Sequence, residues 1–166
     1  SFITLFNTLN KEEKYPNRIL YLWTLGLDEN VKEQLDMSFY PLLNFTKGLA
    51  SQSSFDTLKV WILTDYTFSV NDEETNPVKA TLFGPSIVLP QEYSQIECRM
   101  IDVIPAEISA KDTQRRILNE ISAKAPDIEP FVAIRGVKRW VKRYEKAAIA
   151  PIENKDGFKQ DGVYII

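Results

Sequence analysis

Two almost continuous apolar runs are the strongest structural signal in this chain of 166 residues. One covers residues 18–25 and ends at Gly26, and the other covers residues 58–65. A strand that is apolar along its whole length, and not only at alternate positions, is typical of a parallel sheet with helices on both faces. Both runs therefore predict strands that are buried on both faces.

Helical patterns follow each of these runs. Apolar residues recur at helical spacing over residues 39–49, where Pro41 suits the first turn. Asn76-Pro77 predicts a second helix start with a capping side chain, and Gly84-Pro85 must bend or interrupt that helix. The buried face of this second helix is expected to carry Ala80, Phe83, Ile87 and Val88.

The second half of the chain predicts one more strand, one more helix and a hairpin. Residues 96–103 alternate more than the first two strands, which predicts a place nearer the sheet edge. Ser109 and Asp112 resemble a capping box before a helix that ends at Pro126. Residues 131–144 predict a β-hairpin that turns at Arg135-Gly136. The apolar face of the helix is expected to hold Ile117, Leu118, Ile121 and Ala125.

Strands that alternate with helices predict an α/β fold. We expect a truncated Rossmann-like, mainly parallel sheet flanked by helices, with a C-terminal β-hairpin. The chain divides into a lead-in or linker at residues 1–17, a domain at 18–153, and a linker with a first strand at 154–166. Residues 162–166 resemble the opening of a buried strand without its loop, so the native chain is expected to continue.

The residue counts exclude most catalytic mechanisms. The chain has no histidine, which rules out Ser-His-Asp and Cys-His pairs and imidazole metal ligands. Its single cysteine, Cys98, makes neither an internal disulfide nor a multi-cysteine metal site, in keeping with a reducing cytoplasm. No glycine cluster forms a dinucleotide fingerprint, and the P-loop spacing of Gly157 and Gly162 is followed by Val163-Tyr164 in place of the required Lys-Ser/Thr.

Three other features have simpler interpretations. Asp65 and Asp102 lie at the ends of predicted strands, where a phospho-acceptor could lie but a turn or helix cap is more common. Tyr40 and Asn44 match part of a carbonyl reductase motif but lack the lysine that lowers the tyrosine pKa. The apolar stretch at residues 19–23 is far shorter than a membrane span of about 20 residues, so no membrane association is expected.

The hairpin segment at residues 135–146 is strongly basic. It interleaves Trp140 and Tyr144 with basic side chains, which are ingredients of single-stranded nucleic-acid binding. The whole chain is acidic, with a net charge of −3, and this favours a packing surface for another part of a larger protein. The basic residues are Arg135, Lys138, Arg139, Lys142, Arg143 and Lys146.

The ordered set of motifs resembles the structural subdomain of ketoreductases in modular polyketide synthases. Residues 20–25 are similar to its "LWSL" strand, residues 76–84 to its "DPxxAALWG" helix, and residues 97–102 to its "RCRLID" strand. Residues 131–143 are similar to its "VAYRGGRRYVRRL" hairpin, and residues 162–166 to the strand before its nucleotide loop. The chain departs from the family pattern at Pro85, Pro90 and Tyr93-Ser94.

The resemblance implies a non-catalytic, short-chain-reductase-like scaffold at residues 18–153, without catalytic, cofactor or metal residues of its own. It implies a catalytic half, absent here, that binds NADPH and reduces the β-keto group of an intermediate on an acyl carrier protein. The expected partners are that half directly and the acyl carrier protein and other synthase domains indirectly, in the cytoplasm, with neither nucleic acid nor membrane. The interface candidates are Arg135, Arg139, Trp140, Arg143, Tyr164 and Ile165.

Two other functions stay open on the sequence alone. One is a stand-alone protein-interaction module with a degenerate Rossmann fold. The other is a nucleic-acid-binding α/β module that uses the basic hairpin at residues 135–146.

Overall fold

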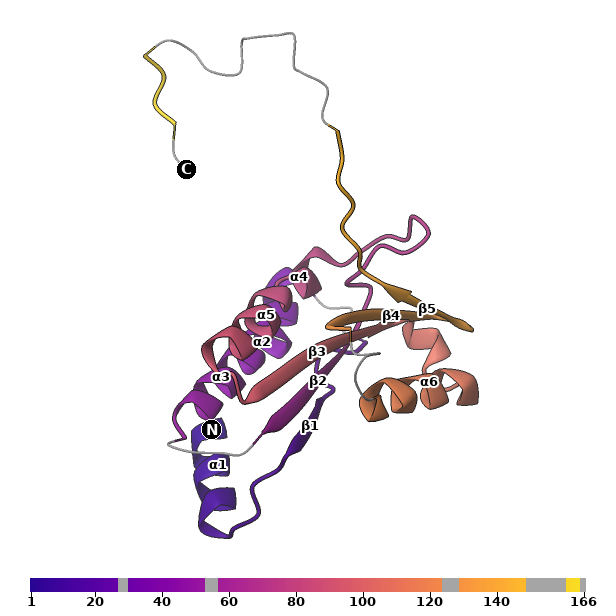
Figure 1. The fold of residues 1–166 in the computed structure, drawn as a ribbon. Helices are drawn as coiled ribbons and strands as arrows, with labels where there is room; N and C mark the ends of the chain where they lie inside the picture. The colour runs from indigo at the N-terminus through magenta and orange to yellow at the C-terminus, as the bar shows by residue number, and fades with distance from the viewer. Residues whose placement is uncertain (27–29, 53–56, 124–128, 149–160, 165–166) are drawn as a thin grey trace.

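A single five-stranded sheet organises the chain in the computed structural model (Figure 1). The structure describes residues 1–26, 30–52, 57–123, 129–148 and 161–164. In order across the sheet, the strands are β1 (Arg18–Tyr21), β2 (Leu58–Asp65), β3 (Ile96–Val103), β4 (Phe131–Arg135) and β5 (Lys138–Val141). The first four strands are parallel and β5 is antiparallel to β4, which confirms the predicted α/β class and its C-terminal hairpin.

Helices cover both faces of the sheet, as Figure 1 shows. The first face carries α1 (Phe2–Lys11), α2 (Val31–Met37), α3 (Phe39–Ala50), α4 (Pro77–Ala80) and α5 (Phe83–Glu92). The second face carries α6 (Lys111–Ser122), which follows the short 3-10 helix η1 (Pro105–Glu107). Both faces of the central strands are therefore covered, as a parallel sheet requires.

The crossover from β3 through α6 to β4 has the opposite hand to the two crossovers before it. Strands β1 to β4 follow one another in one direction, but α3 and α5 pack on one face and α6 packs on the other. About 98% of parallel crossovers are right-handed, so a change of hand within one sheet is unusual. Its consequence here is that α6 buries the second face of the sheet.

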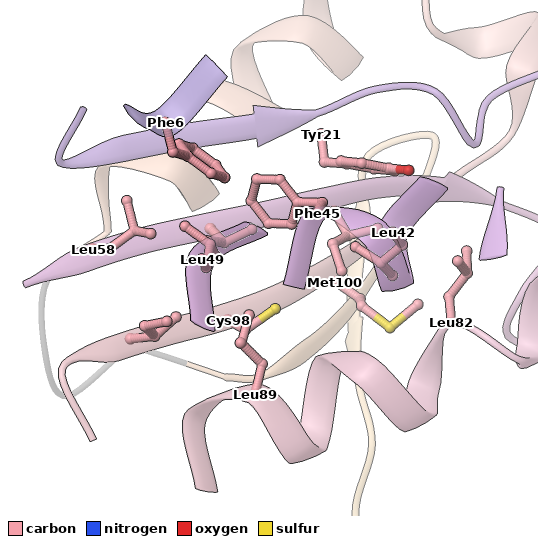
Figure 2. Packing of buried hydrophobic residues seen from close by; sticks show 13 residues of the cluster. Phe6, Tyr21, Leu42, Phe45, Leu49, Leu58, Leu82, Leu89, Cys98 and Met100 are labelled. Atoms are coloured by element: carbon pink, nitrogen blue, oxygen red, sulfur yellow. The ribbon is translucent and has the colours of Figure 1, made fainter. Parts of the chain in front are cut away.

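The main core lies between the sheet and helices α1, α3 and α5 (Figure 2). Phe6, Tyr21 and Phe45 form a ring cluster there, with centroid distances of 5.8 Å between Phe6 and Phe45 and 5.9 Å between Tyr21 and Phe45. Such aromatic pairs add to the free energy gained from burying apolar area. A second, smaller core under α6 contains Trp61, Leu63, Ile101, Val103, Ile117, Val132 and Ile134.

The predicted helix start at Asn76 is confirmed. The Asn76 side chain accepts a hydrogen bond from the Val78 amide at 3.0 Å, and Pro77 opens the first turn of α4. The interruption expected near Gly84 comes slightly earlier, because α4 ends at Ala80 and α5 begins at Phe83.

The break between α4 and α5 also changes which side chains face the core. Ile87 and Val88, predicted to be buried, are 41% and 48% exposed. The inward positions of α5 are Ser86 and Leu89. Ala80, before the break, is exposed as well, and of the four predicted residues Phe83 alone packs against the main core. The predicted face was wrong for the other three, because one helical pattern does not extend across two separate helices.

The predicted positions of the first and third strands are reversed in the structure. The strand β1 lies at the sheet edge, is only four residues long, and leaves Leu20 42% exposed. The strand β3 lies in the middle of the sheet, although its polar residues suggested an edge. Those residues have partners: Glu97 pairs with Lys59 at 3.1 Å, and Asp102 pairs with Arg135 at 2.7 Å.

The predicted lead-in at residues 1–17 contains a helix that belongs to the packed domain. Helix α1 has Ser1 as its N-cap and buries Phe6 to 2% exposure. At the other end, Val163 and Tyr164 belong to no strand, and Val163 is 93% exposed. The predicted strand residues Ile165 and Ile166, and most of the 154–162 linker, lie outside the described residues.

The predicted capping box of α6 is wrong. The N-cap residue is Ala110, which offers no side-chain hydrogen bond, and α6 ends at Ser122. Ile117 is buried as predicted, whereas Leu118 is 61% exposed. Ala125 and Pro126 lie outside the described residues.

Gly48 permits the close approach of α1 to α3. A Cβ atom at this position would lie 2.8 Å from the Phe2 Cβ and 3.2 Å from the Phe2 carbonyl carbon. Gly48→Ala is expected to lower the free energy of unfolding by about 1–3 kcal/mol, because α1 must move away from the core. The matched control is Gly84→Ala in α5, where nothing lies within 4 Å and stability should stay level or rise by up to about 1 kcal/mol. Urea unfolding followed by circular dichroism measures both, and equal effects would contradict the packing argument.

Cys98 is a built-in reporter of unfolding. It is the single cysteine of the chain, it is buried, and desolvation raises the pKa of its thiol to about 12. Since the thiolate is the reactive form, the folded protein is expected to react with a thiol reagent such as DTNB only through opening of the core. The labelling rate should rise steeply through the urea transition. Complete labelling within minutes in buffer would show that this part of the core is open.

Candidate functional site

The carboxyl ends of the parallel strands are the place where open α/β sheets bind their ligands. In this chain, that edge is filled by buried charged side chains. Asp65 ends β2, Asp102 lies near the end of β3, and Arg135 ends β4, with exposures of 1%, 0% and 7%. Lys79 of α4 adds a fourth buried charge, at 1% exposure.

Asp65 and Lys79 form the first ion pair. The Asp65 Oδ1 atom contacts the Lys79 Nζ atom, and the Asp65 Oδ2 atom accepts a hydrogen bond from the Gly26 amide at 2.8 Å. Gly26 has a φ of +67°, which glycine adopts without steric cost and which lets the chain turn after β1. Burial lowers the pKa of Lys79 to about 8, and the charge of Asp102 opposes that shift. The interpretation of Asp65 as a turn cap is confirmed.

Asp102 and Arg135 form the second ion pair. Arg135 Nη2 donates to Asp102 Oδ2 at 2.7 Å, and Arg135 Nε donates to Glu73 Oε2 at 2.7 Å. The guanidinium also donates to the backbone carbonyls of Asp102, Ile134 and Phe68 at 3.1–3.3 Å. All three guanidinium nitrogens are therefore engaged, which is the arrangement that a buried arginine needs.

Electrostatics in this pair follow from burial and direct contact. Burial raises the pKa of Asp102, and its hydrogen bonds from Arg135 and the Thr67 amide oppose the shift. Burial also opposes the charge on Arg135, but hydrogen bonds and charges from Asp102 and Glu73 outweigh it and raise the pKa of the guanidinium. The arginine therefore stays charged, and it supplies the counter-charge for Asp102.

The ion pairs also hold the loop that follows β2. Three residues of this loop, Tyr66, Asn71 and Asp72, have φ values of 50°, 57° and 60°. Asn and Asp adopt this conformation at little cost, whereas a tyrosine there stores strain. Asp102 Oδ1 accepts from the Thr67 amide at 2.8 Å, which anchors the loop beside the strained residue. The cap interpretation of Asp102 is thus confirmed as well.

The carboxyl edge of the sheet is therefore closed by internal ion pairs, in which the buried charges offset one another. Among the described residues no group of three potential metal ligands exists. Across the same part of the chain, no helix is long and apolar enough to cross a membrane. The geometry supports a structural role for the buried charges, since each one binds another part of the same chain.

The structure separates the predicted interface residues. Arg135 is buried in the ionic cluster and offers almost no surface to a partner. Arg139 Nη2 donates to Glu120 Oε2 of α6 at 3.2 Å, and Arg143 Nη2 donates to Glu129 Oε1 at 2.7 Å. Trp140 and Tyr164 are 36% and 46% exposed, and Ile165 lies outside the described residues.

Sequence reasoning missed Lys79 and Glu73. A usable signal for Lys79 was its place between Val78 and Ala80, in a short helix whose other residues are apolar. No sequence pattern pointed to Glu73, because its partner Arg135 is 62 residues away along the chain.

Removing Arg135 is expected to destabilise the fold strongly. Arg135→Leu leaves Asp102 buried without its cation, a change that typically costs about 3–5 kcal/mol. The double variant Arg135→Leu with Asp102→Leu should recover part of that loss, because no unpaired charge remains. Urea unfolding gives the free energies.

The matched control for this prediction is Arg143→Gln. The Arg143 side chain is 64% exposed, so its pair with Glu129 is screened by solvent and the substitution should change stability little. Equal losses for Arg135→Leu and Arg143→Gln would refute the role given to the buried cluster.

Comparison with known proteins supports the fold and assigns the family. A solved structure described as "Adenylation, ketoreductase, and pseudo Asub multidomain structure of a keto acid-selecting NRPS module" is similar with a TM-score of 0.72 and 18% identity. The likeness covers 84% of this chain and 12% of that much longer chain, and at this identity it shows the fold alone. A search of curated proteins gave no match. Because the family model described as beta-ketoacyl synthase-like, N-terminal, matches residues 1–123, this chain belongs to that family.

Proposed function

We propose that this chain is the non-catalytic scaffold half of a ketoreductase in a polyketide-synthase-like module. In this proposal it stabilises a catalytic half that binds NADPH. That half reduces the β-keto group of an intermediate carried by an acyl carrier protein. The observation that carries the proposal is the closed carboxyl edge of the sheet, where Asp102 and Arg135 pair at 2.7 Å.

A nucleotide-binding half needs the opposite arrangement at this edge. The pyrophosphate lies against a glycine-rich turn and the free amide groups of a helix N-terminus. Here the turn after β1 is tied to Asp65 through the Gly26 amide, and Lys79 occupies the space beside it. The same parallel sheet is thus retained while its cofactor edge is used for internal ion pairs.

A scaffold also needs surface to offer, and the hairpin provides it. Val137 at its turn is 68% exposed and Trp140 on β5 is 36% exposed. Buried Arg135 fixes the end of β4, so that these side chains are held on a rigid base. Packing against a rigid support of this kind can hold an active site in its working geometry.

The distribution of charge on the hairpin fits a packing surface better than nucleic-acid binding. Arg135, Arg139 and Arg143 are paired with carboxylates of the same chain. Much of the affinity for nucleic acid arises when basic side chains neutralise phosphates and release the counterions bound to them. An arginine that already pairs with a carboxylate contributes less to this affinity. The absence of nucleic-acid binding stays a prediction.

The proposal is tested by expressing the proposed catalytic half with and without this chain. The isolated chain should show no saturable NADPH binding by fluorescence. The catalytic half alone should lose at least tenfold in reduction of a β-ketothioester mimic, and adding this chain in trans should restore most of it.

Surface variants then test whether the hairpin is the contact. Trp140→Ser should weaken the restored activity, whereas Leu118→Ser, an exposed apolar change on α6, should not. Tight NADPH binding by the chain alone, or full activity of the catalytic half without it, would overturn the proposal.

A further inference from the structure

A cavity of about 420 Å³ lies between the loop after β2 and the β4–β5 hairpin. Small-molecule sites in proteins usually measure about 300–1,000 Å³ and are largely apolar. The cavity lies against Phe131 and Ala133 of β4, and Thr67 in its lining donates a hydrogen bond from its amide to Asp102 of the ionic cluster. Its aromatic walls are Phe68, Phe83, Phe131 and Trp140.

Three of these rings form one continuous apolar surface. The Phe68 and Phe83 centroids are 5.1 Å apart, as are those of Phe83 and Phe131, and Phe68 lies 6.1 Å from Phe131. All three side chains are only partly buried, so ring surface is left to contact an occupant. This surface suits an aromatic ring or a short alkyl chain.

Lys142 gives the cavity a single sign of charge, because it is the one charged residue among the described residues of the lining. Its Nζ atom lies 5.7 Å from the Phe83 ring centroid and 5.0 Å from that of Tyr144. In the described part of the chain no carboxylate forms an ion pair with it. These cation–π contacts hold the ammonium group beside the apolar surface, where it can still donate hydrogen bonds to an anion.

Residues 67–71, which include Phe68, form one side of the cavity and are held by the ionic cluster. The Thr67 amide is anchored on Asp102, and the Phe68 carbonyl is anchored on Arg135. A wall fixed by buried charges keeps the cavity open without a ligand, which lowers the entropic cost of binding.

Two other apolar cavities lack this combination. The cavity between α1 and β1, about 350 Å³, has no charged residue in its lining. The cavity between α3 and α5, about 430 Å³, includes both Lys47 and Glu92, so its charges oppose each other. Of these three cavities, the one at the hairpin alone joins an aromatic wall to an uncompensated cation.

We infer that this cavity binds a small amphipathic monocarboxylate. Its ring or chain packs on Phe68, Phe83 and Phe131, and its carboxylate pairs with Lys142. This inference does not depend on the scaffold proposal, because its test uses the isolated chain, although both surfaces include Trp140.

The probes are 3-phenylpropionate and its uncharged analogue 3-phenylpropanamide, titrated into the full 166-residue chain by isothermal calorimetry. The acid should bind at one saturable site at least tenfold more tightly than the amide. Lys142→Gln should remove that difference, and Lys142→Glu should make the acid the weaker ligand. Trp140→Ala should weaken both ligands, because it removes one wall.

Lys47→Gln, in the cavity between α3 and α5, is the matched control and should leave both affinities unchanged. Lys142 and Trp140 are surface positions, so circular dichroism should show a native fold for all variants. Equal affinity for acid and amide, a preference that survives Lys142→Gln, or no saturable binding at millimolar acid would each overturn the inference.

Discussion

The ion pair between Asp102 and Arg135 is the constraint on which the rest of the structure depends. It joins β3 to β4, and through Glu73 and the Phe68 carbonyl it also joins both strands to the loop after β2. Removing two charges from water is costly, and direct attraction repays the cost only when further hydrogen bonds satisfy the remaining atoms. Here those bonds come from backbone groups of three different segments. The pair therefore fixes one arrangement of the chain more than it adds net stability.

The same pair explains why the carboxyl edge of this parallel sheet is closed. A parallel sheet leaves carbonyl groups and loops at its carboxyl end that a cofactor usually covers. In this chain Asp65 and Asp102 cap the amides of Gly26 and Thr67, and Lys79 and Arg135 neutralise those carboxylates. Rigid loops are the result, and one of them forms a wall of the hairpin cavity.

The sequence allowed the class of fold to be predicted, because apolar runs and helical spacing report burial directly. It did not allow the position of each strand in the sheet to be predicted. The run at β1 is as apolar as a central strand, yet Leu20 is 42% exposed. The apolar pattern alone does not distinguish a buried leucine from an exposed one. The polar residues of β3 suggested an edge because their partners, Lys59 and Arg135, are remote in sequence.

Exposed apolar side chains just after β1 bear on the scaffold proposal. Leu22 and Trp23 are 47% and 57% exposed at one edge of the sheet, while Trp140 lies on the strand at the opposite edge. Four strand spacings of about 4.8 Å each separate β1 from β5, which gives about 19 Å across the sheet. A partner that covers the hairpin therefore reaches β1 only if it extends around the sheet. Otherwise the apolar residues beside β1 contact a different neighbour in the proposed assembly. The hairpin and the β1 edge would then be two separate contact surfaces.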